Sequence, residues 1–244
     1  MSCGSVGNCS AGGHYSSIHS QQAFVINETN GAWGKGTEVA AVLNTLGLAA
    51  TYSVSCGSAG NCSAGGSYTD SFDHGQAFVV NETNGTWGKA KEVAAALDTG
   101  GGAAINSVSC ASAGNCSAGG FYGPSAGVAA FVVNEMNGTW GKATEVATAL
   151  NTGGFAETSS VSCGSAGNCS ASGFYTDSSR GTQAFVINET NGAWGKATEV
   201  AAALNTGGNA WTYSVSCAAA GACSAGGFYT DSTGHGQAFV VSKP

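Results

Sequence analysis

Short apolar runs recur along the chain, each followed by a cluster of turn-forming residues. The clearest run is QAFVVNE at residues 76–82, and Asn84-Gly85 separates it from Trp87. Asn-Gly suits a type I′ turn, because both central residues of that turn need a positive φ. The pattern therefore predicts a β-hairpin centred on these two residues.

The register of this hairpin separates two kinds of side chain. Glu82 is expected to face Trp87, and Val80 to face Lys89. Successive side chains of a strand point to opposite faces, so the long or bulky ones share one face: Phe78, Val80, Glu82, Trp87 and Lys89. The smaller ones share the other: Ala77, Val79, Asn81 and Gly88. Such sheets suit stacking face to face, bulky side into small side.

The hairpin belongs to a unit of about 53 residues that occurs five times. The first Cys of each unit stands at positions 3, 56, 110, 163 and 217. We treat residues 1–244 as one domain with repeats 1–52, 53–106, 107–159, 160–213 and a partial repeat 214–244. Length varies only between the second Cys and the AFV run, which is typical of a surface loop.

Turn signals split each unit into four short strands: SVSC, CSAGGxY, QAFVVNE and WGKAxEV. Four strands in a unit of this length are typical of a propeller blade. We predict an all-β fold, a five-bladed β-propeller of four-stranded antiparallel blades forming a small closed ring, with the last blade incomplete. A β-solenoid is the alternative, although its rungs are usually shorter. Residues 91–101 are interpreted as a strand end followed by a crossing loop, with a short helix as the alternative.

The fifth unit reads only as far as QAFVVSKP, without the Asn-Gly turn, the Trp or the fourth strand. An open strand edge invites pairing with another chain. A homodimer formed through the open last blade is therefore a hypothesis.

The units resemble the cysteine-containing, propeller-like tandem repeats of secreted or surface proteins of actinobacteria. SVSCxSAGNCSAGG, QAFVVNETNGTWGKA and LNTGG carry this resemblance over nearly the whole chain. The resemblance implies architecture and little chemistry. The NETNGTW turn is also similar to the Asp-box hairpin of sialidase-like propellers, but Asn84 stands near where Asp is expected. Sialidases hold a carboxylate with several arginines, and Arg180 is the single Arg here, which argues against that activity.

Composition and charge narrow the range of expected binding partners. Charged residues make up 9% of the chain and the net charge is −7, so the basic footprint that nucleic-acid binding needs is missing. No apolar run approaches the ~20 residues that span a bilayer. We expect no nucleic-acid partner and no membrane insertion. Regular apolar runs and 9% aromatic residues indicate a folded chain rather than a disordered one.

Each unit carries two cysteines six positions apart, flanking a turn. This spacing can place them opposite each other on neighbouring strands, within disulfide reach. The expected pairs are Cys3/Cys9, Cys56/Cys62, Cys110/Cys116, Cys163/Cys169 and Cys217/Cys223. Disulfides indicate an oxidising compartment, so we predict an extracellular or cell-surface protein. Buried thiols and zinc are the alternatives; zinc usually takes a shorter C-x₂₋₄-C spacing and further ligands. We expect no metal and no cofactor.

Repeated residues near the Asn-Gly turn have structural interpretations. Each Glu before the turn and Lys after it are expected to pair diagonally across the hairpin, which contributes about 1 kcal/mol or less. The glutamates are Glu28, Glu82, Glu135 and Glu189, and the lysines are Lys35, Lys89, Lys142 and Lys196. The repeated Trp is interpreted as core between blades, with a sugar-stacking surface as the alternative. No catalytic set of residues is found.

The variable loop carries a Tyr and, in three units, an Asp two residues later. Aromatic faces beside fixed polar groups suit a neutral sugar, although Asp also simply builds turns. The candidate ligand-binding residues are Tyr68, Asp70, Tyr175, Asp177, Tyr229, Asp231 and, outside the loop, Trp211.

Three functions follow from these features. The first is a non-enzymatic, lectin-like binding module, multivalent through its repeats, with glycans or a surface protein as partner. The second is a structural or display propeller without a small ligand, because the most repeated residues all have structural explanations. The third and weakest is a hydrolase with a site at the central channel, where the inner-strand residues are Ser, Val and Cys.

Overall fold

The computed structural model describes residues 1–18, 20–124 and 127–242, and all regular elements in these ranges are β-strands. Residues 19 and 125–126, in the variable loops of the first and third units, and residues 243–244 lie outside the described ranges. No helix in the described ranges is long and apolar enough to cross a membrane.

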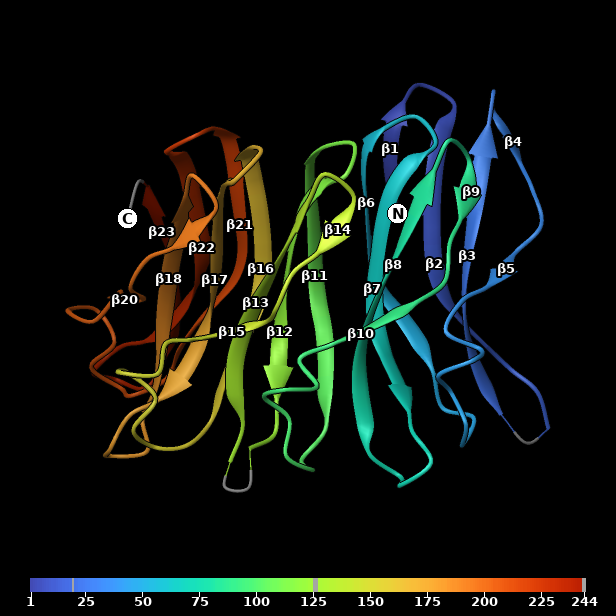
Figure 1. The fold of residues 1–244 in the computed structure, drawn as a ribbon. Helices are drawn as coiled ribbons and strands as arrows, with labels where there is room; N and C mark the ends of the chain where they lie inside the picture. The colour runs from blue at the N-terminus through green and yellow to red at the C-terminus, as the bar shows by residue number, and fades with distance from the viewer. Residues whose placement is uncertain (19, 125–126, 243–244) are drawn as a thin grey trace.

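The strands form five antiparallel sheets, which we call blades 1 to 5 (Figure 1). Blade 1 holds β1 (Ser2–Ser5), β2 (Asn8–Ser16), β3 (Gln21–Thr29), β4 (Ala32–Trp33) and β5 (Thr37–Glu38). Blade 2 holds β6 (Ala50–Ser58), β7 (Asn61–Thr69), β8 (Gly75–Thr83), β9 (Thr86–Trp87) and β10 (Lys91–Val93). Blade 3 holds β11 (Ala103–Ser112), β12 (Asn115–Tyr122), β13 (Ala129–Met136), β14 (Thr139–Trp140) and β15 (Thr144–Val146).

Blade 4 holds β16 (Ala156–Ser165), β17 (Asn168–Thr176), β18 (Thr182–Thr190), β19 (Ala193–Trp194) and β20 (Thr198–Val200). Blade 5 holds β21 (Ala210–Ala219), β22 (Ala222–Thr230) and β23 (Gly236–Ser242). The predicted fourth strand is thus two short strands that both pair with the third, as β9 and β10 do with β8. The described part of the last blade has three strands, in line with the incomplete fifth unit.

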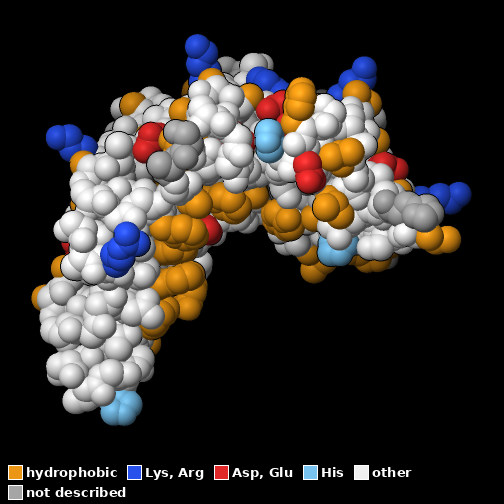
Figure 2. Space-filling model, turned by 90° about the horizontal axis from the view of Figure 1, so that it is seen from below, with side chains coloured by type: hydrophobic (Ala, Val, Ile, Leu, Met, Phe, Trp, Pro, Cys, Tyr) orange, Lys and Arg blue, Asp and Glu red, His pale blue; other side chains and the backbone are white. Residues whose placement is uncertain are grey.

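The blades stand side by side along an arc with the first strands on its concave side (Figures 1 and 2). Four hydrophobic clusters each join two consecutive blades, and none of them joins blade 1 to blade 5 among the described residues. The arc is open in Figure 2. Propeller-like stacking of the repeats is therefore present, whereas the closed five-bladed ring expected from the sequence is not confirmed.

The predicted hairpin turn is present. Asn84 and Gly85 have φ values of 50° and 80°, as a type I′ turn requires. Glu82 faces Trp87, as expected. The expected facing of Val80 and Lys89 is wrong, because β10 resumes the pairing with Lys91 opposite Val79. The chain therefore bulges between Trp87 and Lys91.

The segment after β10 is a turn, as favoured over the helix. Leu97 and Asp98 both donate backbone hydrogen bonds to the carbonyl of Ala94, and the chain then crosses to the next blade. Ala94 itself has a φ of 67°, a left-handed conformation that ends the strand sharply.

Consecutive blades stack bulky face into small face. The bulky face of blade 2, with Phe78 and Val80, packs on the small face of blade 1, with Ala23 and Val25. All four side chains are at most 1% exposed. At about 25 cal/mol per Å² of buried apolar area, these repeated contacts supply the main stabilisation of the arc.

Candidate functional site

All five predicted disulfides are formed, and no free cysteine remains. They join Cys3 to Cys9, Cys56 to Cys62, Cys110 to Cys116, Cys163 to Cys169 and Cys217 to Cys223. Each joins facing positions of the first two strands of a blade. Closing so short a loop is worth roughly 2 kcal/mol on the chain-entropy model. The described residues contain no group of His, Cys, Asp or Glu suited to hold a metal ion.

The two cysteines of a pair differ in burial, which their spacing alone did not predict. Cys9 is 8% exposed and Cys62 is 4% exposed, whereas Cys3 is exposed and Cys56 is partly exposed. The Sγ atom of Cys62 lies 3.3 Å from Ser10 Oγ of the preceding blade. Cys9 and Cys62 are therefore largely buried positions at the contacts between blades.

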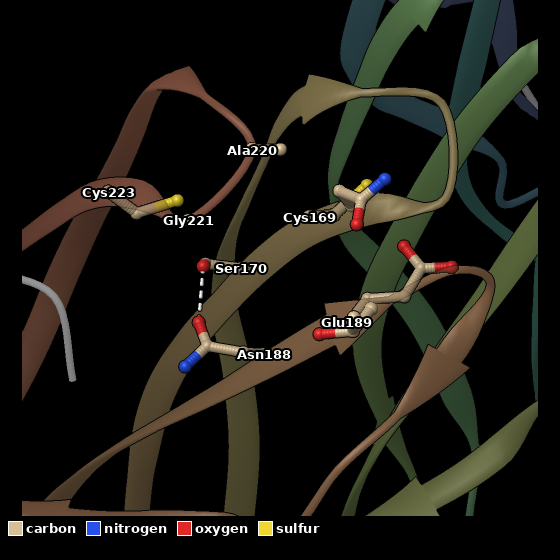
Figure 3. A pocket seen from close by; sticks show the side chains of 9 residues that line it. Cys169, Ser170, Asn188, Glu189, Ala220, Gly221 and Cys223 are labelled. Atoms are coloured by element: carbon tan, nitrogen blue, oxygen red, sulfur yellow. Dashed lines mark hydrogen bonds between the residues drawn. The ribbon is translucent and has the colours of Figure 1, made fainter.

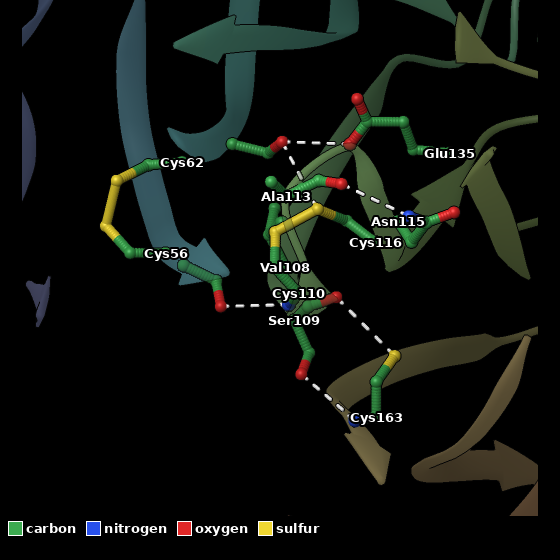
Figure 4. The surroundings of a disulfide bond; sticks show 12 residues. Cys56, Cys62, Val108, Ser109, Cys110, Ala113, Asn115, Cys116, Glu135 and Cys163 are labelled. Carbon is green, nitrogen blue, oxygen red and sulfur yellow. Dashed lines mark hydrogen bonds between the residues drawn. A yellow bond between two sulfur atoms is a disulfide. The ribbon is translucent and has the colours of Figure 1, made fainter. Parts of the chain in front are cut away.

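Serine hydroxyls connect the inner strands of neighbouring blades. Ser55 Oγ accepts a hydrogen bond from the backbone nitrogen of Cys110 at 2.9 Å, and Ser109 Oγ accepts one from Cys163 at 3.0 Å. Figure 4 shows both bonds beside the disulfides of blades 2 and 3. The SVSC strand therefore links neighbouring blades through these serine hydroxyls.

The repeated Glu lies buried between blades instead of pairing with Lys. Glu82 is 4% exposed and accepts hydrogen bonds from Asn27 Nδ2 and Ser10 Oγ of the preceding blade. The predicted Glu–Lys pairs are wrong, because the bulge at Lys89 carries that side chain to the surface. The one ion pair recorded among the described residues joins His74 and Asp70.

The same arrangement repeats at the next two interfaces. Glu135 accepts from Asn81 at 2.5 Å and from Ser63 at 3.0 Å, and Glu189 bonds to Asn134 and Ser117. Burial raises the pKa of each of these carboxyls, and the hydrogen bonds from Ser and Asn oppose that rise. The glutamates therefore join each blade to the preceding one.

The three candidate aspartates hold their own loops. Asp70 Oδ1 accepts from the backbone nitrogens of Phe72 and His74, and Oδ2 accepts from Gln76. Asp177 and Asp231 hold their loops in a similar way. Oδ1 of Asp177 accepts a hydrogen bond from the Ser179 hydroxyl, and Oδ1 of Asp231 accepts one from the Thr233 hydroxyl. Burial would raise the pKa of Asp70, but these hydrogen bonds keep it below its ordinary value. For Asp177 and Asp231 the side-chain hydroxyl bond is the largest cause of a lowered pKa.

Two of the three candidate tyrosines are buried. Tyr68 and Tyr175 are each 3% exposed, so neither ring face is open to a ligand. Burial raises the pKa of both hydroxyls, and their bonds to Glu92 and Glu199 raise it further. Tyr229 is partly exposed and packs against the cluster between blades 4 and 5. Ligand binding by this loop remains a prediction, and the loop geometry matches the turn-building alternative.

Trp211 belongs to a strip of aromatic rings across blades 4 and 5. Its ring stacks on Phe174 with centroids 3.9 Å apart, and Phe174 stacks on Phe155 at 5.7 Å. On the other side Trp211 contacts Tyr213 at 6.3 Å, and Tyr213 stacks on Phe228 at 5.7 Å. We call these five residues the aromatic strip.

The strip is accessible near its two ends. Tyr213 is 60% exposed and Phe155 is 40% exposed, while Phe174 between them is buried. Trp211 and Tyr213 lie on β21, an inner strand, and Figure 2 shows hydrophobic side chains gathered on the concave side that the inner strands line. Exposed rings on a concave surface are a feature that binding sites share.

Two polar side chains border the aromatic strip. Glu157 stands opposite Phe174 in the β16–β17 register, and burial raises the pKa of its carboxyl while a hydrogen bond from Asn106 opposes the rise. Asn209 Oδ1 accepts the indole hydrogen of Trp211 at 3.0 Å. Ring faces, a carboxyl group and an amide thus lie together.

A cavity of about 360 Å³ lies between blades 4 and 5, among residues of both first hairpins. Ser170 donates to Asn188 within it, with Cys169 on one side and Cys223 on the other (Figure 3). The same place between blades 1 and 2 holds a smaller cavity of about 200 Å³, which Glu82 of the following blade helps to line. The cavity between blades 4 and 5 has no such Glu from the described part of blade 5.

No known family model matches the chain, and no curated protein matches it in sequence. Among solved structures, a protein of unknown function from Dyadobacter fermentans DSM 18053 is 13% identical with a TM-score of 0.51. That match covers 94% of this chain and 66% of that protein, so the chain spans just under two thirds of its length. The likeness indicates a shared fold. The resemblance to actinobacterial repeats stays a prediction.

Two further structures have lower TM-scores. A thermostable family-43 glycoside hydrolase is 8% identical at a TM-score of 0.41, over 99% of this chain and 92% of that one. A six-bladed β-propeller lectin from Aleuria aurantia that recognises fucose is 10% identical at 0.33, over 97% and 92%. Superposition this loose transfers neither activity to the present chain.

Trp211 was a candidate from the sequence, whereas the other four residues of the strip were not predicted. None of its five residues belongs to the Tyr/Asp pattern, and Phe155, Trp211 and Tyr213 fall in the segment just before SVSC. That segment also differs between units: Ala50, Ala104, Glu157 and Trp211 occupy one repeat position. Variation among copies at that position is the signal that could have found the site.

Proposed function

We propose that the protein is a non-enzymatic binding module that holds carbohydrate against the aromatic strip. The exposure of Tyr213 and Phe155 near the ends of a continuous row of rings is the observation that carries this proposal. The C–H faces of a sugar ring pack on aromatic rings, and its hydroxyls hydrogen-bond to carboxyl and amide groups. Glu157 and Asn209 supply such groups beside the rings.

The absence of a catalytic role is part of the same proposal. Glycoside hydrolysis usually needs two carboxyl groups that converge on one bond, roughly 5 to 10 Å apart. Strand register brings Glu157 beside the strip, whereas Asp177 and Asp231 are held in their own turns. A single bordering carboxyl supports binding over hydrolysis.

An extracellular or cell-surface location fits this function. Five disulfides, one in each blade, are typical of proteins from oxidising compartments. Glycans of a cell surface would then be the partner. Mass spectrometry of the protein from its native source, without reduction, is expected to show ten cysteines in disulfides; free thiols would contradict this location.

A glycan array followed by calorimetry tests the sugar proposal. We expect Tyr213→Ala to weaken binding of the best array ligand at least tenfold, because it removes the most exposed ring of the strip. Tyr52→Ala is the matched control, since Tyr52 occupies the same repeat position in blade 2, is 57% exposed and lies outside the strip. A silent array, or equal losses in both variants, would contradict the proposal.

A structural or display role without a small ligand is the second candidate. It is favoured by the buried Glu, Asn, Ser and Trp contacts, which account for the most repeated residues as links between blades. The glycan array also separates these two candidates.

A further inference from the structure

Two sheet faces are left uncovered by the described chain, the bulky face of blade 1 and the small face of blade 5. Trp33 on the first is 46% exposed, whereas Trp140 at the same repeat position is 5% exposed. Val240 on the second is 77% exposed, whereas its counterpart Val132 is fully buried. The apolar side chains that join blades elsewhere therefore face outward at both ends.

Some polar groups of the two faces also match, although Ser242 of blade 5 stands where the internal small faces carry Asn27, Asn81 and Asn134. At an internal interface Ser55 accepts from the Cys110 backbone, and Ser63 donates to Glu135. Blade 5 presents the counterparts Ser216 and Ser224, both exposed. Blade 1 presents the counterparts Cys3 and Glu28.

The glycine of the small face is uncovered in blade 5 as well. Internal small faces carry a glycine against which side chains of the next blade pack: a Cβ on Gly119 would lie 2.5 Å from Thr158 Cγ2. Gly226 is the counterpart in blade 5, and its nearest neighbour to such a Cβ is a carbonyl of its own blade at 3.6 Å. That part of the face is therefore open, and β1 of blade 1 (Ser2–Ser5) would cover it only in part, because β1 holds no residue at the repeat position of Thr158.

Blade 1 and blade 5 of one chain lie at opposite ends of the open arc (Figure 2). We propose that the bulky face of blade 1 packs on the small face of blade 5 of a second copy of this chain. The contact continues an interface that already occurs four times within the chain. Because it joins two different faces, it is head-to-tail and lets association continue or close into a ring.

Sedimentation velocity from low to high micromolar concentration tests this association. The wild-type chain is expected to shift from monomer to larger species as concentration rises. Ile26→Glu on the bulky face and Val240→Glu on the small face should each leave the chain monomeric. Val42→Glu, at an 87% exposed position in the turn after β5, is the control and should associate like wild type.

Mixing the two variants gives the sharper result. Ile26→Glu keeps an intact small face and Val240→Glu keeps an intact bulky face, so an equimolar mixture should form a one-to-one dimer and nothing larger. Circular dichroism checks that both variants fold. A wild type that stays monomeric throughout, variants that associate like wild type, or a mixture that stays monomeric would each overturn the proposal.

Discussion

The indole nitrogen of Trp87 donates a hydrogen bond to Oδ1 of Asn27 in the preceding blade, at 2.8 Å. The same Asn27 donates through Nδ2 to Glu82, which lies on the blade of Trp87. One amide thus connects two residues of the next unit, and the contact recurs for Trp140 with Asn81 and for Trp194 with Asn134. The repeated residues of the chain are in this way the means by which one unit recognises the next.

Removing the indole hydrogen bond should lower the free energy of unfolding at Trp87, where the preceding blade supplies the acceptor, and not at Trp33. Trp87→Phe is expected to lower the free energy of unfolding by about 1 kcal/mol, measured by urea titration at low protein concentration. Trp33→Phe is the control, because no described blade precedes it. Equal losses in both would show that the indole contributes through bulk and not through Asn27.

The serine hydrogen bonds between inner strands should also contribute to stability only where a following blade is present. Ser55→Ala leaves the partly buried backbone nitrogen of Cys110 without its acceptor, so we expect the free energy of unfolding to fall by about 1 kcal/mol. Ser216 occupies the same repeat position on the exposed face of blade 5, and Ser216→Ala should change stability little. If urea titration finds the two variants equally stable, the serine bonds do not hold the blades.

The second glycine of the CSAGG motif lies so close to the backbone of the paired strand that a side chain at this position would clash. A Cβ on Gly120 would lie 1.8 Å from the carbonyl oxygen of Ala104, so Gly120→Ala is expected to cost at least about 2 kcal/mol. Gly13→Ala in blade 1 would meet only the Phe24 ring, at 3.3 Å, and should be tolerated. Thermal melts compare the pair, and a tolerated Gly120→Ala would mean that the inner strand can move away.

The buried glutamates should make the chain more stable in mild acid. Their folded pKa lies above the ordinary value of 4.5, so their contribution is fully present below that pH and is lost as pH rises through the folded value. Melting temperature should therefore fall as pH rises above 4.5. Below about pH 4 the loop aspartates, whose pKa is lowered from 3.8, act oppositely, since protonating them removes stability.

A triple variant isolates this effect. Replacing Glu82, Glu135 and Glu189 by Gln should flatten the decline of melting temperature with pH, because an amide does not ionise. Glu28→Gln removes a carboxyl that no preceding blade of the described chain covers and serves as the comparison. A triple variant with the wild-type slope would assign the pH dependence to other groups.

The architecture was readable from the sequence because local chemistry and global packing agree. Asn84-Gly85 fixed the turn, the alternation at Phe78 and Val79 fixed which face meets which neighbour, and the even Cys spacing fixed the disulfides. The role of Glu82 was not readable, because its partners Asn27 and Ser10 belong to the preceding blade and reach it only when the blades stack. The aromatic strip was missed because it forms only when β17 and β21 lie side by side, bringing Phe174 and Trp211 together from different units.

Bulky-into-small stacking makes the chain nearly one-dimensional in its energetics. Each interior unit touches the unit before it and the unit after it, so stability is close to a sum over nearest-neighbour contacts. Loss of structure then costs least at the ends, where a unit has one neighbour, and unfolding should proceed by fraying inward from blades 1 and 5. The aromatic strip, shared by blades 4 and 5, lies at one of those ends, and so its integrity depends on the least protected contact of the array.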